Sequence, residues 1–312
     1  MEKDFDVITA LDTCVDFLVN CGDTEPEFGQ KEKLIDGYAL EMGGSACIFA
    51  CQCAKLGLKT AGVGMVGSDY MGDIVMNSLN NSGVDTSFVR KSPDAKTGLG
   101  VLLTKNNGDR SILTYMGTID KVKSEWLNVL LPRTKHLHIC SYFLHRGLQQ
   151  GYKDIVRIAK KHNVTISLDT NWDPDENWDS GINDILPYVD IFLPNENELL
   201  YLARQKNVSD ALRHLGNIVP IIALKCGENG AHVYHKGNVI KMDALKVSAV
   251  DTVGAGDSFN GGFIYGFLSK LPIEECLRVG IICGSQSVRK AGGISGQPDL
   301  SDMLKKFRTT NI

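Results

Sequence analysis

The sequence predicts a three-layer α/β/α protein with a doubly wound, mainly parallel sheet and a small β-sheet lid. Short β-branched runs such as TISLDT and PIIALKCG alternate with helical runs such as GYKDIVRIAKKHN, and brief turn-rich joints separate them. This alternation is typical of βαβ units, whose parallel strands are covered by helices on both faces. The 312 residues contain no internal repeat or domain-scale linker, so we expect one domain spanning residues 1–312.

The second half of the chain predicts the parallel sheet and its helices, and two other stretches predict the lid. The expected order is strand 137–140, helix 150–161, strand 165–169, a helix, strand 190–193, helix 196–205 and strand 221–225. Residues 15–40 and 97–118 break this rhythm. The second stretch predicts a hairpin, because apolar positions alternate on both sides of KNNGDR, whose Asn-Gly pair suits a tight turn. We expect both stretches to form a small sheet that projects as a lid.

Composition argues against several classes of protein. The net charge of −4 comes from 33 basic and 37 acidic residues spread along the chain, so we expect no concentrated basic face and no nucleic-acid partner. The start MEKDFDVITALD lacks a basic segment followed by a long apolar one, and no later stretch approaches the roughly 18 apolar residues of a membrane span. A soluble cytoplasmic protein is expected. The nine cysteines lie mostly in apolar runs, and no structural metal is expected.

One glycine motif suggests a different function. GVGMVG at residues 62–67 matches G-x-G-x-x-G, and Asp85 follows at roughly the distance of a ribose-binding acid. The polar stretch SDYMGD, however, separates the last glycine from the helix-like IVMNSLNN, so this helix would not begin on the glycine turn. Asp85 also precedes a strand-like run instead of following one. Both observations argue against a dinucleotide site. A dehydrogenase is kept only as an alternative function, which the absorbance of bound NAD(P) would reveal.

Residues 250–263, VDTVGAGDSFNGGF, predict an anion site with a carboxylate beside it. Gly254, Ala255 and Gly256 carry little or no side chain, so their N–H groups can approach a ligand where an apolar helix begins. Asp257 follows in the first turn, where it would repel a phosphate unless a substrate hydroxyl lay between them. Such N–H groups stabilise a moving phosphoryl group while the carboxylate orients the hydroxyl and accepts its proton. We expect Asp257 to keep the low pKa of an ordinary carboxylate. A plain glycine-rich turn is the alternative.

Five motifs, in the same order, resemble those of the ribokinase-like, or pfkB, carbohydrate kinase family. DTVGAGDSFNGGF looks like the family's C-terminal signature, EMGGSACIFACQCAKLGL like its N-terminal Gly-Gly region, and PNENE like its N-x-x-E motif. LKCGENGAHVY and the GDRSILTYMG hairpin also fit, and the likeness runs from about residue 6 to residue 298. The resemblance implies a ribokinase-like fold and ATP-dependent, Mg²⁺-assisted transfer of a phosphoryl group to a hydroxyl.

The resemblance also assigns roles around the nucleotide. Asn195 and Glu198 match the pair that holds Mg²⁺ through water, which suits a cation that keeps several waters; a helix N-cap with first-turn acids is the alternative. Asp251, together with the backbone near Val253 and the loop 290–296, resembles a monovalent-cation (K⁺) site found in part of the family. The implied nucleotide-binding residues are Asn195, Lys225, Gly227, Gly230, Gly254 and Gly256. A plain hairpin turn would need similar glycines at residues 227 and 230.

Substrate contacts are expected at the end of the first strand. Asp12 and Asp16 lie at or just past that end, where open α/β sheets bind ligands, and carboxylates there can accept bonds from sugar hydroxyls. Gly43 and Gly44 would let the backbone come close to the sugar. Asp12, Asp16 and Gly44 match substrate positions of the family. Solvated loop acids are the alternative.

Two departures from the family pattern leave the substrate open. Ile48 stands where an Asn is usual, which removes a partner for a sugar hydroxyl. In LDTNWDP, Asp173 replaces the Arg of a D-x-N-x-R pattern, which argues against an acidic or phosphorylated sugar. Arg110 and Arg146 remain as sources of positive charge, although a lone Arg is more often a solvated surface residue.

The sequence therefore predicts an ATP-dependent kinase that phosphorylates a primary alcohol on a small sugar, with Asp257 as the base and residues 254–256 as the anion hole. A purine-nucleoside kinase of the same family is the first alternative. A non-catalytic sugar-binding sensor is the second, although a sensor has no need of a base. The sequence leaves open a homodimer through the lid.

Overall fold

The structure is a computed structural model that describes residues 3–309. Its larger sheet has nine strands in the order β13-β12-β11-β10-β9-β8-β1-β4-β5. Neighbouring strands from β11 to β5 in this order are parallel, whereas β12 pairs antiparallel with both β11 and the edge strand β13. The strands are β1 (Phe5–Ala10), β4 (Thr60–Gly67), β5 (Asp85–Ser92), β8 (Thr134–Ile139), β9 (Thr165–Leu168), β10 (Ile191–Phe192), β11 (Ile221–Lys225), β12 (Ala231–His235) and β13 (Asn238–Met242). The predicted α/β class is confirmed.

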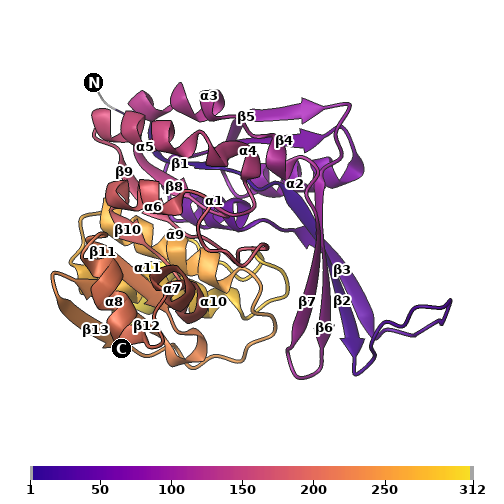
Figure 1. The fold of residues 1–312 in the computed structure, drawn as a ribbon. Coiled ribbons are helices and arrows are strands. Elements are labelled where there is room, and N and C mark those ends of the chain that lie inside the picture. The colour runs from indigo at the N-terminus through magenta and orange to yellow at the C-terminus, as the bar shows by residue number, and fades with distance from the viewer. Residues whose placement is uncertain (1–2, 310–312) are drawn as a thin grey trace.

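Helices cover both faces of this sheet (Figure 1). One layer contains α1 (Ser45–Lys55), α2 (Tyr70–Asn81), α9 (Ala255–Leu268), α10 (Ile273–Ser287) and α11 (Leu300–Thr309). The other contains α3 (Ser124–Asn128), α5 (Tyr152–Lys161), α6 (Ile182–Ile185), α7 (Glu196–Ala203) and α8 (Val208–Gly216). A single-turn helix, α4 (Arg146–Gln149), precedes α5.

The central strands are buried on both faces because each helical layer has its own apolar core. Along β11, Ile222 packs into the cluster with α5, α7 and α8, whereas Ile221 and Ala223 pack into the cluster with α9 and α10. Alternate residues of a strand point to opposite faces, so an apolar run such as PIIALK suits a strand covered on both sides.

A second sheet of four strands projects from one side of the larger sheet (Figure 1). Its order is β3-β2-β6-β7, with β2 (Cys14–Gly22), β3 (Gly37–Met42), β6 (Gly98–Lys105) and β7 (Arg110–Tyr115). β6 and β7 form an antiparallel hairpin, and β2 pairs parallel with β6. The two stretches that interrupt the βαβ rhythm therefore lie side by side in one small sheet.

The predicted boundaries of the numbered helices and strands differ from the observed ones by at most three residues, and strand 221–225 is observed as predicted. Helix α7 ends at Ala203 instead of residue 205, because Arg204 adopts a left-handed conformation with φ 52° that terminates the helix. Strand β9 ends at Leu168, which leaves Asp169 just beyond the sheet. Within residues 3–309, no helix is both long enough and apolar enough to cross a membrane.

All nine cysteines are buried and free. Burial raises the pKa of the thiols of Cys47 and Cys53 well above the ordinary value. Such thiols stay protonated and behave as small apolar side chains.

Candidate active site

The glycine-rich stretch ends in the first turn of α9, as the sequence predicts. Gly254 is the residue before the helix, with φ 71°, and no side chain caps the helix start. Ala255 N lies 3.4 Å from Thr252 O, which is a long hydrogen bond. The next two N–H groups, of Gly256 and Asp257, have no intrahelical acceptor because they lie in the first turn. The start of α9 therefore offers free N–H donors of the kind that bind anions, and residues 251–256 that lead into it are called the anion turn below.

Glycine is required at residue 254 for two reasons. Its positive φ is unfavourable for other residues, and a Cβ there would lie 2.9 Å from Gly293 Cα and 3.0 Å from Ile48 Cγ2. The loop around Gly293 thus packs directly against the anion turn.

Asp257 is buried beside this turn, with 8% of its surface exposed. Burial raises the pKa of its carboxyl well above the ordinary value, and the nearby charge of Asp169 raises it further, while Lys225 and a hydrogen bond from Ser45 act in the opposite direction. The expectation of a low pKa is therefore wrong, because the sequence does not reveal the burial. A raised pKa makes a carboxylate a stronger base, which suits proton transfer.

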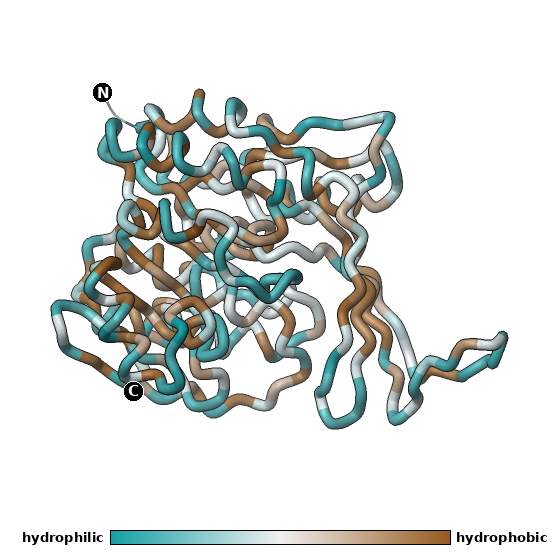
Figure 2. Tube along the Cα trace, viewed as in Figure 1, coloured by the Kyte–Doolittle hydropathy of each residue, from teal (hydrophilic) through white to brown (hydrophobic). Residues whose placement is uncertain are grey.

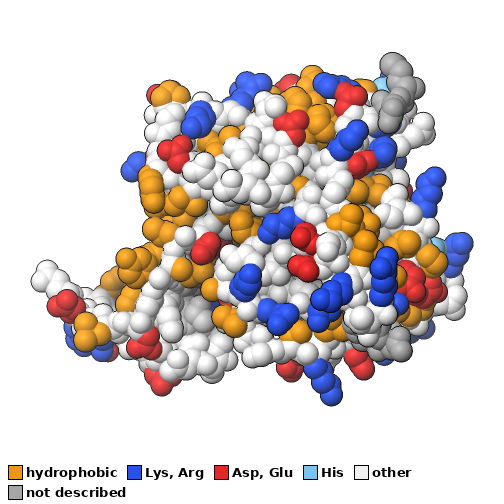
Figure 3. All heavy atoms as spheres, turned by 180° about the vertical axis from the view of Figure 1, so that it is seen from behind, with side chains coloured by type: hydrophobic (Ala, Val, Ile, Leu, Met, Phe, Trp, Pro, Cys, Tyr) orange, Lys and Arg blue, Asp and Glu red, His pale blue; other side chains and the backbone are white. Residues whose placement is uncertain are grey.

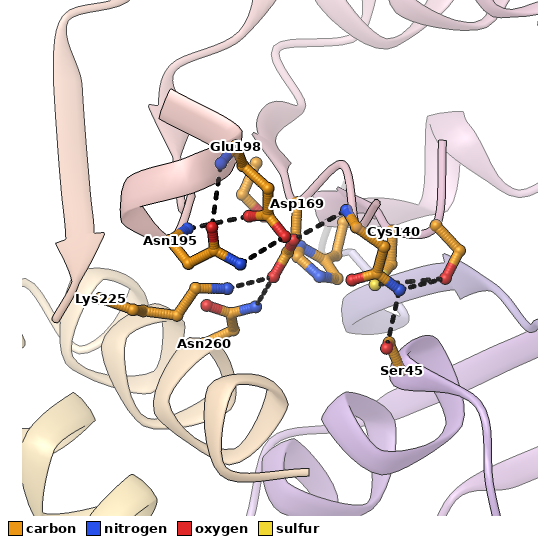
Figure 4. Close-up of polar contacts among 11 residues, drawn as sticks. Ser45, Cys140, Asp169, Asn195, Glu198, Lys225 and Asn260 are labelled. Carbon is orange, nitrogen blue, oxygen red and sulfur yellow. Dashed lines mark hydrogen bonds and ion pairs between the residues drawn. The ribbon is translucent and has the colours of Figure 1, made fainter. Parts of the chain in front are cut away.

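A buried cation lies next to the anion turn. Lys225 Nζ lies 2.5 Å from Asp169 Oδ2, and Asn260 Nδ2 donates to the same oxygen at 2.5 Å (Figure 4). Burial lowers the pKa of Lys225, but the charges of Asp169 and Glu198 outweigh this effect and raise it overall. A Cβ at Gly256 would lie 3.5 Å from Lys225 Nζ, so the ammonium group stays charged within reach of an anion at the helix start.

Asn195 and Glu198 form a capping box at the start of α7 (Figure 4). Asn195 Oδ1 accepts from Glu198 N at 2.9 Å, while the Glu198 carboxylate accepts from Asn195 N and Asn195 Nδ2, both at 2.8 Å. An isolated parallel β-bridge between the backbones of Asn195 and Lys225 holds this capping box next to the Lys225 side chain. Burial, then the charge of Asp169, raises the pKa of Glu198 to about 7. Asn195 and Glu198 therefore do cap the helix. They also lie beside the Lys225 cation, and their role in holding Mg²⁺ stays a prediction.

A chain of hydrogen bonds joins Asp12 to Asp257. The Ser141 hydroxyl donates to Asp12 Oδ2 at 2.5 Å, and Asn171 Nδ2 donates to the hydroxyls of Ser141 and Ser45 at 2.9 and 2.8 Å. Ser45 in turn hydrogen bonds to Asp257. Hydroxyl, amide and carboxylate groups therefore line one continuous path from the end of β1 to the first turn of α9.

Asp16 and the paired glycines are placed differently from the prediction. Asp16 lies within β2 of the small sheet, not at the edge of the large one. A Cβ at Gly43 would lie 2.2 Å from Asp16 Oδ1, and a Cβ at Gly44 would lie 2.3 Å from Asp12 O. These glycines therefore accommodate the two aspartates, and the close approach of a sugar to their backbone stays a prediction. Burial, then the charge of Asp12, raises the pKa of Asp16 to about 7.

The other predicted nucleotide and cation positions lie on two loops. A Cβ at Gly230 would lie 2.0 Å from Met242 O, so the plain-turn interpretation explains this glycine, whereas Gly227 has open space around it. Asp251 accepts from Val253 N and from Gly292 N, both at 3.0 Å, and so ties the anion turn to the loop 290–296. The monovalent-cation site at Asp251 stays a prediction.

The two arginines have different partners. The Arg110 guanidinium, at the start of β7, donates to the hydroxyl of Thr252 and so links the small sheet to the anion turn. Arg146 forms an exposed ion pair with Asp175 at 3.1 Å. Of the two, Arg110 is the one that reaches the site.

The dinucleotide interpretation of residues 62–67 fails in the structure. All three glycines lie inside strand β4, so no glycine turn leads into α2. A Cβ at Gly62 would lie 2.5 Å from Leu11 Cδ1, which explains that glycine by packing within the sheet. Asp85 is the first residue of β5, at the wrong end of the strand for a ribose contact.

Several side chains at the site were not predicted. Ser45, Ser141 and Asn260 were missed, and Asp169 was considered only as part of an incomplete pattern. Asp169 directly follows β9 and Ser141 lies two residues beyond β8, so the rule that ligands bind beyond the carboxyl ends of parallel strands could have found both. Asn260 is part of the glycine-rich signature itself.

Known proteins resemble this chain over most of its length. The model of the pfkB family carbohydrate kinases matches residues 9–300. An uncharacterized sugar kinase from Archaeoglobus fulgidus is 30% identical over 246 residues, covering 78% of this chain and 97% of its own. A ribokinase from Haemophilus influenzae is 26% identical, covering 90% of this chain and 92% of its own.

Solved structures share the fold. The ribokinase of Arabidopsis thaliana, in complex with ribose and ATP, aligns with a TM-score of 0.83 at 22% identity, covering 99% of this chain and 100% of its own. The adenosine kinase of Sinorhizobium meliloti aligns with a TM-score of 0.84 at 22% identity, covering 98% and 99%.

The family match and the shared fold define a kinase of small molecules built on a ribokinase-like fold. The chain belongs to the pfkB family of carbohydrate kinases. The family resemblance found in the sequence is confirmed.

Proposed function

We propose that this protein transfers the γ-phosphoryl group of ATP to a primary hydroxyl of a small sugar, with Asp257 as the base. The observation that carries the proposal is the position of Asp257, a buried carboxyl in the first turn of an uncapped helix with the ammonium group of Lys225 beside it. A carboxyl at a helix start with no cation beside it would only stabilise the helix.

In the proposed reaction, Asp257 orients the substrate hydroxyl and accepts its proton. The hydroxyl oxygen forms a bond to the γ-phosphorus while the bond from the γ-phosphorus to the bridging oxygen breaks, and ADP leaves. The N–H groups of Gly256 and Asp257, with Lys225, stabilise the charge on the moving group. The loose transition state leaves most of the catalysis to position and charge.

The residues present fit a Mg²⁺ ion held through water. Both oxygens of Glu198 already accept one hydrogen bond each from Asn195, and each keeps a lone pair for a metal-bound water. Within residues 3–309, no group of three or more His, Cys, Asp or Glu side chains could hold a metal, which agrees with a cation bound mainly by phosphates and water. When bound, Mg²⁺ supplies charge neutralisation between the phosphates.

A polyol is the substrate that suits the path from Asp12 to Asp257. Asp12 can accept hydrogen bonds from hydroxyls, while Ser141, Asn171 and Ser45 can each donate or accept. Within residues 3–309, the side chains of this path include no Arg or Lys, and a sugar phosphate would need such a cation. The proposed substrate is therefore an uncharged sugar or nucleoside.

We also propose that two copies pair through the small sheet. Tyr38, Leu40, Leu113 and Tyr115 are 72, 38, 62 and 53% exposed, and the strand register places them on one face. The opposite face carries Asp16 and Arg110. Figures 2 and 3 show apolar residues gathered on this projecting sheet. In sedimentation, the protein should have about twice its chain mass of 34.1 kDa, and Leu113→Lys should restore the monomer. A monomeric wild-type protein would contradict this proposal.

A direct test of the function is an ADP-release screen over ribose, fructose, keto-deoxy acids, sugar phosphates and nucleosides. The proposal expects Mg²⁺-dependent turnover with at least one uncharged sugar and none with sugar phosphates. Turnover with nucleosides alone would favour the nucleoside kinase. If all acceptors bind but none yields ADP, the protein is a sensor and the proposal is wrong.

A further inference from the structure

A cavity of about 400 Å³ lies in the helical layer that contains α10 and α11, outside the candidate active site. It is bounded by the end of α10, the loop that follows it, and α11. Its lining residues are Gln286, Arg289, Lys290, Ser295, Gly296, Gln297, Pro298, Asp302, Lys305 and Lys306.

The cavity is strongly basic although the whole chain is acidic. Four of its lining side chains are cations and one is an acid, Asp302. Among the residues that the structure describes, none of the four cations forms an ion pair with a carboxylate. Lys and Arg side chains gather on the lower half of the face seen in Figure 3. The sequence separates these cations into two groups, and the fold brings them together.

Two further contacts hold positive charge at this place. Gln286 Oε1 accepts from Arg289 Nη1 at 3.0 Å, so the guanidinium group is held in position before any ligand arrives. Lys55 Nζ donates to Ile294 O at 2.6 Å on the same loop, which adds a fifth cation nearby. Unpaired cations in a concave site favour a ligand with several negative charges, and guanidinium and ammonium groups are the usual partners of phosphate.

The loop that lines this cavity also contacts the anion turn. Gln297 Nε2 donates to Ser258 Oγ at 3.1 Å, one residue after the proposed base. Gly292 N donates to Asp251 Oδ2 at 3.0 Å, and Gly293 packs against Gly254. A ligand that orders the residues 290–297 would therefore order the anion turn behind them.

We infer that the cavity is a second anion site, separate from the active site, which binds a small compound carrying at least two phosphate charges and thereby orders residues 251–256. The compound is held by Arg289, Lys290, Lys305 and Lys306. The inference concerns binding and order, so it does not depend on which acceptor the enzyme phosphorylates.

Calorimetry with inorganic pyrophosphate at low salt tests the site. The double variant R289Q/K305Q should weaken the binding by at least about tenfold, because it removes two charge-assisted contacts. The matched control K161Q, a surface lysine at the end of α5, should bind like the wild type. Equal affinity in R289Q/K305Q and wild type would overturn the inference, because the pyrophosphate would then occupy the active site alone. Absence of binding in the wild type would overturn it as well.

Hydrogen exchange gives an independent readout. Pyrophosphate should slow amide exchange in residues 290–296 and in residues 251–256 of the wild type, and this protection should be lost in R289Q/K305Q and reduced in the single variant K306Q. Protection of residues 251–256 that persists in the double variant would contradict the coupling between cavity and anion turn.

Discussion

Lys225 Nζ lies 2.5 Å from Asp169 Oδ2, and this buried ion pair is the only cation contact of Asp169 within the described residues 3–309. Lys225 ends β11 and Asp169 follows β9, so the two side chains meet at the carboxyl edge of the sheet. The carboxyls of Asp257 and Glu198 share the charge of the same lysine. Proton affinities in this cluster are therefore linked.

The variant Asp169→Asn should move the acid limb of the pH dependence of kcat to lower pH. The charge of Asp169 raises the pKa of Asp257, and without it Lys225 lowers that pKa further. Because a base acts only when ionised, activity should persist at pH values where the wild type has lost it. Asp190→Asn is the matched control, since Asp190 forms a 2.5 Å ion pair with Lys160 away from the site. An unchanged acid limb in Asp169→Asn would contradict the coupling.

The small sheet should close on bound substrate. Its hairpin already reaches the anion turn through Arg110 and Thr252, and exclusion of water protects a phosphoryl donor from hydrolysis. Sugar and nucleotide together should slow amide exchange in residues 98–113, and Arg110→Gln should weaken this protection. If exchange there is unchanged at saturation, the sheet is not a lid.

Glu198→Gln should raise the Mg²⁺ concentration needed for activity and leave sugar affinity unchanged. Gln can still accept the capping hydrogen bond from Asn195 N, but it loses the second bond, from Asn195 Nδ2, and the negative charge that attracts metal-bound water. Asp210→Asn is a matched control, because Asn207 and Asp210 cap α8 with the same spacing outside the site. An equal Mg²⁺ titration for Glu198→Gln and wild type would assign Glu198 to capping alone.

The ionised carboxylate of buried Asp16 should destabilise the folded protein at alkaline pH. Burial, then the charge of Asp12, raises its pKa to about 7, well above the value in the unfolded chain. The folded state therefore binds the proton more tightly, and stability falls as pH rises from about 4 to about 7. In chemical denaturation, Asp16→Asn should be more stable than wild type by about 2–4 kcal/mol at pH 8 and nearly equal to it at pH 4.

The exposed Asp94→Asn serves as the control for this measurement and should show no such difference. A constant difference between Asp16→Asn and wild type across this pH range would show that Asp16 is ionised throughout.

Strand and helix periodicity could predict the large sheet and the helix at residue 255, because both signals are local. The anion turn could also be predicted, since its glycines and Asp257 are adjacent in the chain. The raised pKa of Asp257 could not, because it depends on burial and on the charges of Asp169 and Lys225, which lie far from it in the sequence. The packing of Gly43 could not be predicted for the same reason, since the atoms that a Cβ there would meet belong to Asp16 in another element.

Arg110 shows a further limit of the sequence. Its charge was noted, but its partner Thr252 lies 142 residues away, and only the fold brings the two together. The basic cavity has the same origin, because residues 289–290 and 305–306 meet only when α11 packs against α10.

Asp257→Asn tests the central claim most directly. The variant keeps the shape of the side chain but removes the base, so kcat should fall by about 10²–10⁴, the usual contribution of a positioned acid–base group. Nucleotide affinity should persist or increase, because a negative charge near the phosphates has gone. ADP formation and nucleotide binding by calorimetry should be measured on the same folded preparation. A folded variant that retains more than about a tenth of wild-type kcat would contradict the assignment of Asp257 as the base.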